Sequence, residues 1–178
     1  YADFHAAREP AGREGLLFVA GFAHPPNIDA ARWLCEQIMP RVRERVPGAK
    51  LRLVGSSPSP EVLALAGPLT EVTGQVPEEE LLAHYRRARV AVVPLRFGAG
   101  IKSKVVEALQ QGLPLVTTLV GAQGLPGVER VAAVSDSPQS IADAIVRLLS
   151  DEDEWRRCSR DRGAGSGVVV RAGIEAGD

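Results

Sequence analysis

Cysteines, long apolar runs and an excess of either charge are scarce or missing in this sequence. Its 178 residues include two cysteines, and 21 basic side chains nearly balance 22 acidic ones. The net charge of −1 gives no electrostatic footprint for nucleic acid and no polybasic patch for anionic lipid. Cys35 and Cys158 lie outside any zinc-ligand spacing, so neither a metal site nor a disulfide framework is expected. Reduced thiols are typical of a cytoplasmic protein, and a small ligand is the expected partner.

The chain also lacks targeting and membrane-spanning segments. No stretch approaches the roughly 18 apolar residues that cross a bilayer, and the N-terminus has no signal-peptide pattern. The first residue is Tyr1 rather than Met, which favours a fragment whose N-terminal part is missing. Residues 1–15, which are polar and aperiodic, are expected to be a linker from that part, followed by one domain over 16–158. The glycine-rich residues 159–178 are expected to be a tail that is disordered or foreign to the fold.

Apolar runs alternate with segments of helical periodicity along the whole domain. The run LLFVA (16–20) is continuously apolar, as in a strand that is buried on both faces. Residues 27–46 have helical spacing, and Pro40 is expected to kink or split that helix. Because parallel neighbours need crossover connections, the alternation predicts a Rossmann-like, doubly wound α/β domain with about six parallel strands. The other strands are expected at 51–55, 69–74, 89–95, 113–118 and 131–135, and the other helices at 60–66, 77–88, from about 101, and at 137–150 and 151–158.

The segment GAGIKSKVVEALQQGLP (98–114) follows the fourth expected strand and is the most informative. In an open parallel sheet, ligands bind beyond the carboxyl ends of the strands, where helices begin. Gly98 and Gly100 let backbone amides approach an anion closely. A helix that starts near Ile101 adds unpaired N–H groups and the positive end of its dipole. The segment therefore predicts a phosphate site.

The charged side chains of this segment suit the same kind of ligand. Glu107 shares a helix face with Ser103, one turn beyond the anion position, and its carboxylate can accept two hydrogen bonds from the vicinal hydroxyls of a sugar. Lys102 and Lys104 point in different directions, so at most one of them is expected to reach the phosphates. The alternative is a glycine turn before an amphipathic surface helix, with Lys104 and Glu107 as a weak exposed pair. Spacing alone leaves both interpretations open.

Other polar and aromatic residues are expected to have structural roles. Asn27 is predicted to cap the helix that follows it, and His84 is predicted to lie on a helix surface. Arg96 follows the fourth strand and suits a phosphate contact and a surface ion pair equally well. Trp33 and Trp155 are predicted to pack within the fold rather than to stack on a ligand.

Three stretches carry a resemblance to a known family: FVAGFAHPPNIDAARWL, LRLVGSSP and VTGQVPEEELLAHYRRARVAVVPLRFGAGIKSKVVEALQQGLPLVTTLVGAQGL. Together they resemble the C-terminal, donor-binding half of the group 1 (family 4) glycosyltransferases of the GT-B fold, over residues 16–150. The stretch from Val72 to Leu125 is the most specific. The resemblance implies transfer of a sugar from a nucleotide-diphosphate sugar with retention of configuration. It implies no bound metal and no cofactor besides that donor.

The resemblance also implies features that lie outside this chain. The acceptor would bind an N-terminal domain that is absent here, so the fragment alone is expected not to turn over. A role in cell-envelope glycan biosynthesis would place the protein in the cytoplasm or at the inner face of the membrane. Any peripheral membrane contact would then be made through the missing domain.

The family's roles carry over to the residues that match its motifs. Glu107 matches the second of two glutamates separated by seven residues, and it would hold the nucleotide ribose. Val76, in the turn after the third strand, would contact the base, and Gly21 and Phe22 would border the diphosphate. The glycine loop and the neighbouring side chains would face the diphosphate or the sugar. These residues are Gly98, Ala99, Gly100, Ile101, Lys102, Ser103, Lys104 and, past the fourth strand, Arg96.

Two departures from the family pattern leave an alternative function open. Ala99 stands where the first glutamate would contact the donor sugar, and the turn GFAHPPN has no Arg or Lys to neutralise the diphosphate. Lys102 or Lys104 would have to supply that charge. The alternative is a non-catalytic module of the same fold that binds a nucleotide or phosphorylated ligand. A third interpretation, in which the chain is half of a dinucleotide-dependent oxidoreductase, is disfavoured because no G-x-G-x-x-G follows the first strand.

Overall fold

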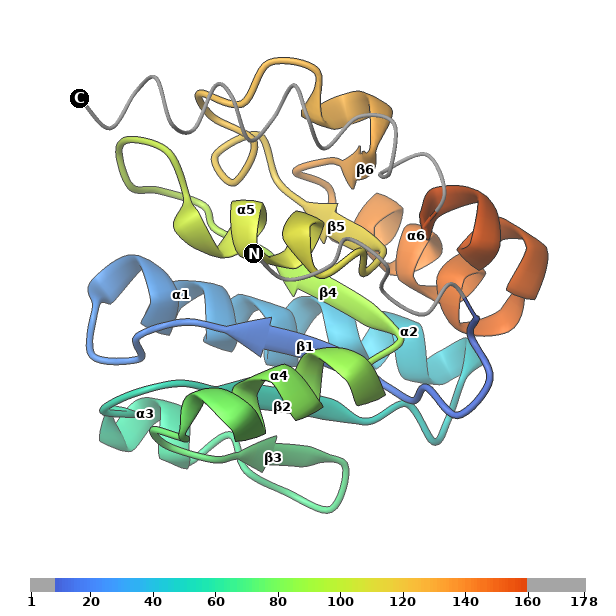
Figure 1. Cartoon of the computed structure of the whole chain (residues 1–178). Helices are drawn as coiled ribbons and strands as arrows, with labels where there is room; N and C mark the ends of the chain where they lie inside the picture. The colour runs from blue at the N-terminus through green and yellow to red at the C-terminus, as the bar shows by residue number, and fades with distance from the viewer. Residues whose placement is uncertain (1–8, 160–178) are drawn as a thin grey trace.

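Six parallel strands form the centre of the structure, a computed structural model that describes residues 9–159 (Figure 1). The strand order is β3-β2-β1-β4-β5-β6. The strands are β1 (Leu16–Val19), β2 (Leu51–Val54), β3 (Thr70–Val72), β4 (Val90–Val93), β5 (Leu115–Thr117) and β6 (Ala132–Val134). All six lie within the segments expected from the apolar runs. The predicted doubly wound, Rossmann-like sheet is therefore confirmed.

The two central strands of the sheet, β1 and β4, consist only of apolar residues. All residues of β1 and β4 are buried, because helices cover both faces of the sheet at this position. Leu16 of β1 lies opposite Leu51 of β2 on one side and Val90 of β4 on the other. The order of the strands along the chain reverses between β1 and β4, so the loops that leave these two strands are neighbours at the carboxyl edge.

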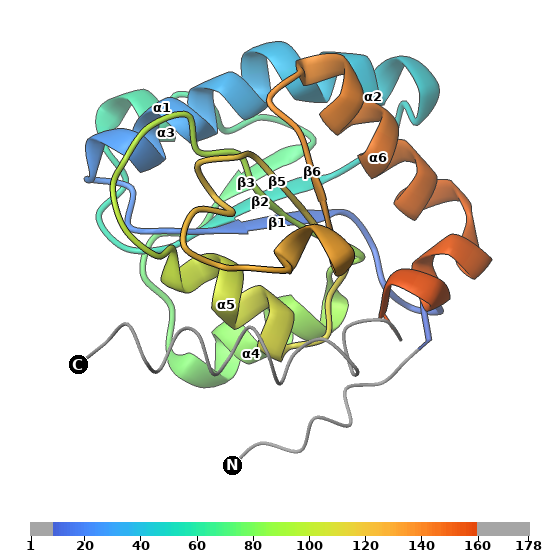
Figure 2. The same ribbon diagram turned by 90° about the horizontal axis from the view of Figure 1, so that it is seen from above.

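Helices cover the two faces of the sheet unequally (Figure 2). One face carries the helices that follow β1, β2 and β6, and the other carries those that follow β3 and β4. The helices are α1 (Pro25–Trp33), η1 (Leu34–Ile38), α2 (Met39–Arg45), α3 (Pro60–Leu63), α4 (Glu78–Arg87), α5 (Ser103–Gln110), the short 3₁₀ turn η2 (Val128–Arg130) and α6 (Pro138–Ser150), and a last helix covers 152–159. None of the helices over residues 9–159 is long and apolar enough to cross a bilayer.

The predicted interruption of the first long helix is present, and it takes the form of a π-helical segment. η1 joins α1 to α2, and Pro40 stands in the first turn of α2. Proline has no N–H to donate to the carbonyl four residues earlier, and its ring crowds that carbonyl. The wider turn of a π-helix relieves this conflict without ending the helix.

The prediction that Trp33 and Trp155 pack within the fold is confirmed, whereas the prediction that His84 lies on the surface is wrong. Trp155 has no exposed surface, and its Nε1 donates to the Arg89 carbonyl over 2.8 Å. Trp33 is 8% exposed. His84, expected on the surface, is only 2% exposed. Spacing along α4 alone could not reveal this, because the side chain that covers His84 comes from β2, where Arg52 contacts its ring.

The residues at the start of the described chain pack against the domain. Arg13 Nη1 donates to the carbonyls of Tyr85 and Ala88, and the Glu14 N–H donates to the carbonyl of Arg87. The end of α4 is thereby joined to the segment that leads into β1. Residues 1–8 of the expected linker and 160–178 of the expected tail lie outside the described residues.

Candidate functional site

Two loops meet at the carboxyl edge where the strand order reverses, between β1 and β4. Arg96, after β4, donates to both carboxylate oxygens of Asp29 on α1, over 2.9 and 2.6 Å. A Cβ added at Gly98 would lie 3.6 Å from Cγ of Pro26, so the glycine loop passes close to the start of α1. In α/β sheets of this kind, ligands bind at this reversal point. The predicted glycine site is therefore located where the topology favours a ligand.

The glycine loop is longer than the sequence suggested, and α5 begins later. Gly98 and Gly100 have φ angles of +120° and +83°, which side-chain-bearing residues rarely adopt. Lys102 is extended, with φ −92° and ψ 105°, and α5 begins at Ser103 rather than near Ile101. These non-helical conformations turn the chain away from β4 before the helix starts, and the exposed backbone of residues 98–100 faces solvent.

The start of α5 offers a row of free donors. Among the described residues, no acceptor is hydrogen-bonded to the backbone N–H groups from residue 98 to 104. The first helical N–H groups and the helix dipole favour an anion at this position. The neighbouring α1 is less suited to an anion, because Pro25 and Pro26 fill its first turn and have no N–H.

The two lysines of the loop are held by acceptors from their own segment. Lys102 Nζ donates to the Gly100 carbonyl over 2.7 Å, and partial burial lowers the pKa of Lys102. Lys104 Nζ lies 3.1 Å from Oε2 of Glu107, and the two side chains are 38% and 30% exposed. The expected surface pair is therefore present. The ammonium group of Lys102 therefore lies at the glycine loop, whereas that of Lys104 lies at Glu107 one turn along α5.

Glu107 also contacts a residue that sequence reasoning missed. Tyr85 of α4 is 3% exposed. Its pKa is raised, first by burial and then by the charge of Glu107 and a hydrogen bond to that carboxylate. Glu107 thus lies on the side of α5 that faces α4, one turn from the glycine loop and near the buried Tyr85 hydroxyl. No pattern within 98–114 could reveal this partner, because Tyr85 belongs to another helix.

The turn after β1 differs from the expectation in two ways. Phe22 has no exposed surface and packs edge-to-face against Phe18, with ring centroids 5.4 Å apart. Its N–H and carbonyl are bonded to Ser56 and Ser59, so Phe22 is a core residue and cannot border a ligand. Asn27 does not cap α1, because its Nδ2 donates to the Gly21 carbonyl over 2.9 Å.

His24, not Asn27, occupies the N-cap position of α1, without a side-chain cap bond. The paired prolines place the helix start three residues earlier than the asparagine suggested, since proline favours the first helical turn. Asn27 therefore lies inside the helix and fixes the preceding turn instead. Gly21 keeps a partly exposed position directly after β1.

Arg96 is engaged in a surface ion pair rather than left open to a phosphate. Besides its two bonds to Asp29, its guanidinium lies 5.2 Å from the ring centroid of Trp33. The hydrogen bond to Asp29 raises the pKa of Arg96. Of the two roles that the sequence left open, the structure contains the ion pair, which ties α1 to the loop after β4.

Two further loops lie at the carboxyl edge of the sheet, after β3 and after β5. Gly74, with φ +73°, accepts a hydrogen bond from the Gly55 N–H, and Val76 beyond it is partly buried against the core. On the other side, a Cβ at Gly124 would lie 2.9 Å from Cγ1 of Ile101, so the loop after β5 packs directly on the glycine loop. Both loops lie at the same end of the sheet as the start of α5 (Figure 1).

The loop after β5 is fixed by two threonines, and the apolar side chains at this edge are exposed. Thr117 Oγ1 donates to the Val93 carbonyl over 2.8 Å, and the Thr118 hydroxyl donates to the Leu95 carbonyl. Phe97 and Leu119, which sequence reasoning did not single out, are 47% and 65% exposed at the ends of β4 and β5. These two hydrogen bonds from threonine hydroxyls hold the loop after β5 against the end of β4.

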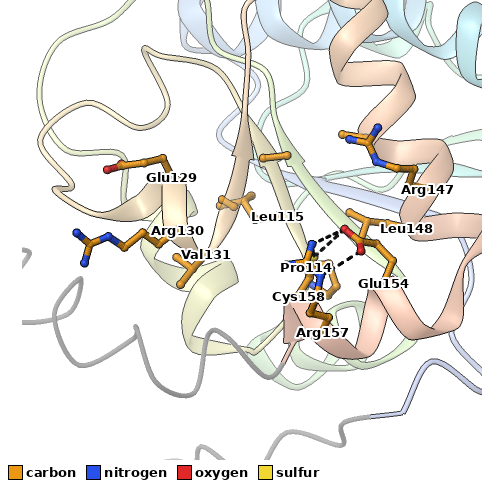
Figure 3. Close-up of a pocket in the computed structure, with 13 residues that line it drawn as sticks. Pro114, Leu115, Glu129, Arg130, Val131, Arg147, Leu148, Glu154, Arg157 and Cys158 are labelled. Atoms are coloured by element: carbon orange, nitrogen blue, oxygen red, sulfur yellow. Dashed lines mark hydrogen bonds and ion pairs between the residues drawn. The ribbon is translucent and has the colours of Figure 1, made fainter.

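Two hollows of the described surface lie at the opposite, amino-terminal edge. One has a volume of about 220 Å³ and is bordered by the starts of β5 and β6, α6 and the last helix (Figure 3). There the carboxylate of Glu154 points toward Arg157 and Cys158, and its bond to Arg157 Nη2 is 2.6 Å long. The other hollow has a volume of about 640 Å³ and adjoins β2 and β3. Neither is bordered by the glycine loop.

A family model matches most of the chain, and curated proteins are similar to it in sequence. The profile described as "Glycosyl transferases group 1" matches residues 13–151. A GDP-mannose-dependent alpha-(1-6)-phosphatidylinositol monomannoside mannosyltransferase of Mycobacterium tuberculosis is 32% identical over 156 residues, covering 78% of this chain and 38% of that protein. A glycogen synthase of the same organism is 28% identical over 158 residues, covering 84% of this chain and 37% of that enzyme.

The solved structures show the same fold at low sequence identity. TarM of S. aureus matches with a TM-score of 0.69 and 13% identity, over 98% of this chain and 36% of its own. At that identity the likeness concerns the fold alone. In each of these comparisons the chain spans little more than a third of the other protein's length.

Proposed function

The chain belongs to the group 1 glycosyltransferase family, and from this premise we propose that it is the donor-binding half of a retaining glycosyltransferase. A nucleotide-diphosphate sugar binds at the carboxyl edge of the sheet, and its sugar passes to an acceptor held by a domain outside this chain. The observation that carries the proposal is the row of uncommitted N–H groups over residues 98–104 at the start of α5. A diphosphate is the part of such a donor that these groups suit.

In this proposal the diphosphate lies against the loop backbone at Gly98, Ala99 and Gly100. The sequence favoured one lysine at most at the phosphates, but here both are proposed to turn to them. Lys102 leaves the Gly100 carbonyl, since charge-assisted bonds to phosphate are stronger than those to a carbonyl, and Lys104 leaves Glu107. When the bond to the sugar breaks, negative charge grows on the leaving diphosphate, and preorganised amides and ammonium groups stabilise it. These groups supply the positive charge without a metal ion, so transfer by a longer enzyme is expected to persist in EDTA.

The ribose is proposed to bind at Glu107. Once Lys104 turns to the diphosphate, the carboxylate can accept hydrogen bonds from two vicinal hydroxyls. Ser103 lies one turn closer to the loop on an exposed position and adds a hydroxyl on the same side. Tyr85 keeps the carboxylate in place from the α4 side.

The base is proposed to rest against the turn after β3. Val76 supplies a partly buried apolar contact there, and Gly21 borders the diphosphate from the turn after β1. The backbone bond between Gly55 and Gly74 joins the ends of β2 and β3 and supports that turn. A base that stacks beside Val76 needs no charged partner, so this contact alone favours no particular nucleotide.

A second candidate function is a binding module without catalysis. It is favoured by Ala99, which stands where the family pattern has its first glutamate, so the usual contact to the donor sugar is missing. Such a module binds the nucleotide equally well, and the two functions differ only in turnover. A longer chain that includes the acceptor-binding part and releases nucleoside diphosphate from the donor supports the enzyme. Binding without release supports the module.

The cellular setting is proposed from relatives. One is named for phosphatidylinositol monomannoside, a lipid acceptor, and this supports a role in cell-envelope glycan synthesis at the cytoplasmic face of the membrane. Membrane contact would then be made by the acceptor-binding part. Transfer to lipid-linked acceptors by the longer protein, compared with soluble sugars, tests this setting.

Calorimetric titration of the present chain with UDP, GDP and ADP tests the donor site. One of the three is expected to bind, and Glu107→Gln is expected to weaken it about tenfold, the loss of one strong hydrogen bond. The chain is expected not to transfer sugar by itself. Absence of binding by all three nucleotides contradicts the proposal, and so does binding that Glu107→Gln leaves unchanged.

Tyr85→Phe separates the two roles of Glu107. It removes the buried hydroxyl that Glu107 serves, but it leaves the carboxylate available to a ribose. If Glu107 binds the ribose, Tyr85→Phe binds nucleotide about as well as the original chain, and adding Glu107→Gln to it still weakens binding. If Glu107 interacts only with the Tyr85 hydroxyl, adding Glu107→Gln to Tyr85→Phe has no effect on nucleotide affinity.

A further inference from the structure

The 640 Å³ hollow at the amino-terminal edge brings two guanidinium groups close together. It lies between the starts of β2 and β3 and the end of α4, at the opposite end of the sheet from the glycine loop. Lys50, Arg52 and Arg87 line it, together with Glu14 and Glu71. Its volume is in the range of sites that take small metabolites.

Arg52 and Arg87 converge on one nitrogen atom. Nη1 of Arg52 lies 3.0 Å from Nδ1 of His84, and Nη2 of Arg87 lies 3.2 Å from the same atom. A guanidinium can only donate, so Nδ1 is the acceptor and His84 is neutral, with its proton on Nε2. The two cations are therefore close neighbours that share a single lone pair of a buried, uncharged ring.

No carboxylate neutralises these two guanidinium groups within ion-pair distance among the described residues. Glu14 is engaged with Lys50 over 3.2 Å, and Glu71 acts on Arg52 only at longer range. Nη2 of Arg52 is buried and has no hydrogen-bond partner. Burial and then the charge of Arg87 lower the pKa of Arg52. An unpaired, partly desolvated cation beside a second cation is costly, and an anion in the hollow removes that cost.

We propose that this hollow is a second ligand site, which binds the phosphate group of a small phosphomonoester between Arg52 and Arg87. A phosphomonoester carries a charge of about −1.5 to −2 near pH 7, which matches two uncompensated guanidinium groups. Their planar forks suit its oxygens. Pro68 and Leu69 also line the hollow and give the body of the ligand an apolar surface.

The position of this site decides the kind of role its ligand has. The hollow is at the amino-terminal edge, whereas the proposed donor site is at the carboxyl edge, so a ligand here does not reach the reacting atoms. It acts as an effector rather than as a substrate. The site rests on the arginine geometry and does not depend on the proposed donor function.

Amide chemical shifts locate binding residue by residue and therefore test this site. The present chain is titrated with glycerol 3-phosphate and, separately, with inorganic phosphate as probes. Saturable shifts are expected at the amides of Leu51, Arg52 and Thr70 with both probes, and at His84 Nδ1. Shifts confined to residues 98–104 overturn the proposal, as do shifts that do not saturate. UDP titration followed at residues 98–104 reports the donor site independently.

Neighbouring arginines provide a matched control. Arg87→Gln and Arg86→Gln remove the same charge from adjacent exposed positions on α4, but only Arg87 lines the hollow. Arg87→Gln is expected to weaken glycerol 3-phosphate about tenfold, the loss of one charge-assisted bond, whereas Arg86→Gln leaves it within twofold. Equal weakening by both variants shows non-specific attraction and overturns the proposal. Both positions are exposed, so folding is expected to persist, and the unchanged remainder of each spectrum verifies it.

Discussion

The ammonium nitrogen of Lys104 lies 3.1 Å from Oε2 of Glu107, one turn further along α5. In the proposed donor site these two groups have different ligands, the lysine a phosphate and the glutamate a ribose. The pair therefore holds both side chains at the site while it is empty, and each loses its partner when the donor binds. An exposed pair of this kind contributes less than about 1 kcal/mol, so separating it costs little compared with the bonds that replace it.

The two lysines are expected to contribute unequally to nucleotide affinity. Lys102→Met removes one charge near the diphosphate and is expected to weaken the nucleoside diphosphate that binds about tenfold. Lys104→Met is expected to weaken it more, because the substitution also leaves the Glu107 carboxylate uncompensated near the phosphates. Calorimetry in low and high salt measures both effects. Arg45→Met, a charge removal on the distant α2, should change affinity less than twofold, and a loss equal to that of Lys102→Met would mean that net charge alone is being measured.

Arg96 provides the opposite test, because the structure removes it from the expected phosphate contacts. With its guanidinium bonded to Asp29 and stacked on Trp33, Arg96→Met is expected to leave nucleotide affinity within twofold. The half-exposed ion pair should cost less than about 1 kcal/mol of unfolding free energy. Calorimetry measures the nucleotide affinity, and urea unfolding measures the free energy of unfolding. A tenfold loss of affinity without a loss of stability would show that Arg96 leaves Asp29 to bind the diphosphate.

The fold was predictable from the sequence because its signal is local. Runs such as LLFVA and VAVV are apolar at every position, and only strands covered on both faces need that pattern. Alternation with helical segments then fixes parallel pairing. The boundaries that were missed depend on backbone detail: α5 starts at Ser103 because the extended Lys102 delays it, and α1 starts at Pro25 because proline is favoured there.

The site was predictable only where one segment contains it. The glycine loop, both lysines and Glu107 fall within 17 consecutive letters of the sequence, and the structure brings them together. Contacts between elements were beyond sequence reasoning. The sequence places Phe22 in a loop after β1 and so predicts a ligand contact, but in the structure Phe18 and the turn after β2 enclose its side chain. The sequence likewise gives no sign that Tyr85 is close to Glu107. These pairings depend on how helices and turns pack over the sheet.

Gly55 is expected to be the glycine least tolerant of substitution. It follows β2 with φ +155°, and an added Cβ would lie 1.6 Å from the carbonyl oxygen of Ala20, which is backbone and cannot move aside. Gly55→Ala is expected to lower the free energy of unfolding by about 3 kcal/mol or more. Urea unfolding measures the change. Gly48→Ala is the control, since a Cβ there meets nothing within 4 Å, and it should stay within about 0.5 kcal/mol. Similar losses in both variants would contradict the packing around Ala20.

The buried His84 is expected to lower the free energy of unfolding as the pH falls. The groups that face it are Arg52 from β2, Arg87 from the same helix, and at longer range Glu80 and Glu71. Its pKa is lowered from 6.5, first by burial and then by the charges of Arg52 and Arg87. The unfolded chain therefore binds a proton near pH 6.5 that the folded chain does not bind. The stabilisation by neutral His84 is complete above pH 6.5 and is lost as the pH falls through 6.5 toward the lower folded pKa.

Urea unfolding at several pH values tests this dependence. Below pH 6.5 the free energy of unfolding of the original chain is expected to fall by up to about 1.4 kcal/mol per pH unit from this group. His84→Asn should flatten that slope, because an amide oxygen can still accept from the two arginines but does not titrate. His24→Asn is the matched control, since His24 is exposed at the start of α1, and it should keep the slope. A slope that survives His84→Asn unchanged would assign the pH dependence to groups other than His84 and contradict this prediction.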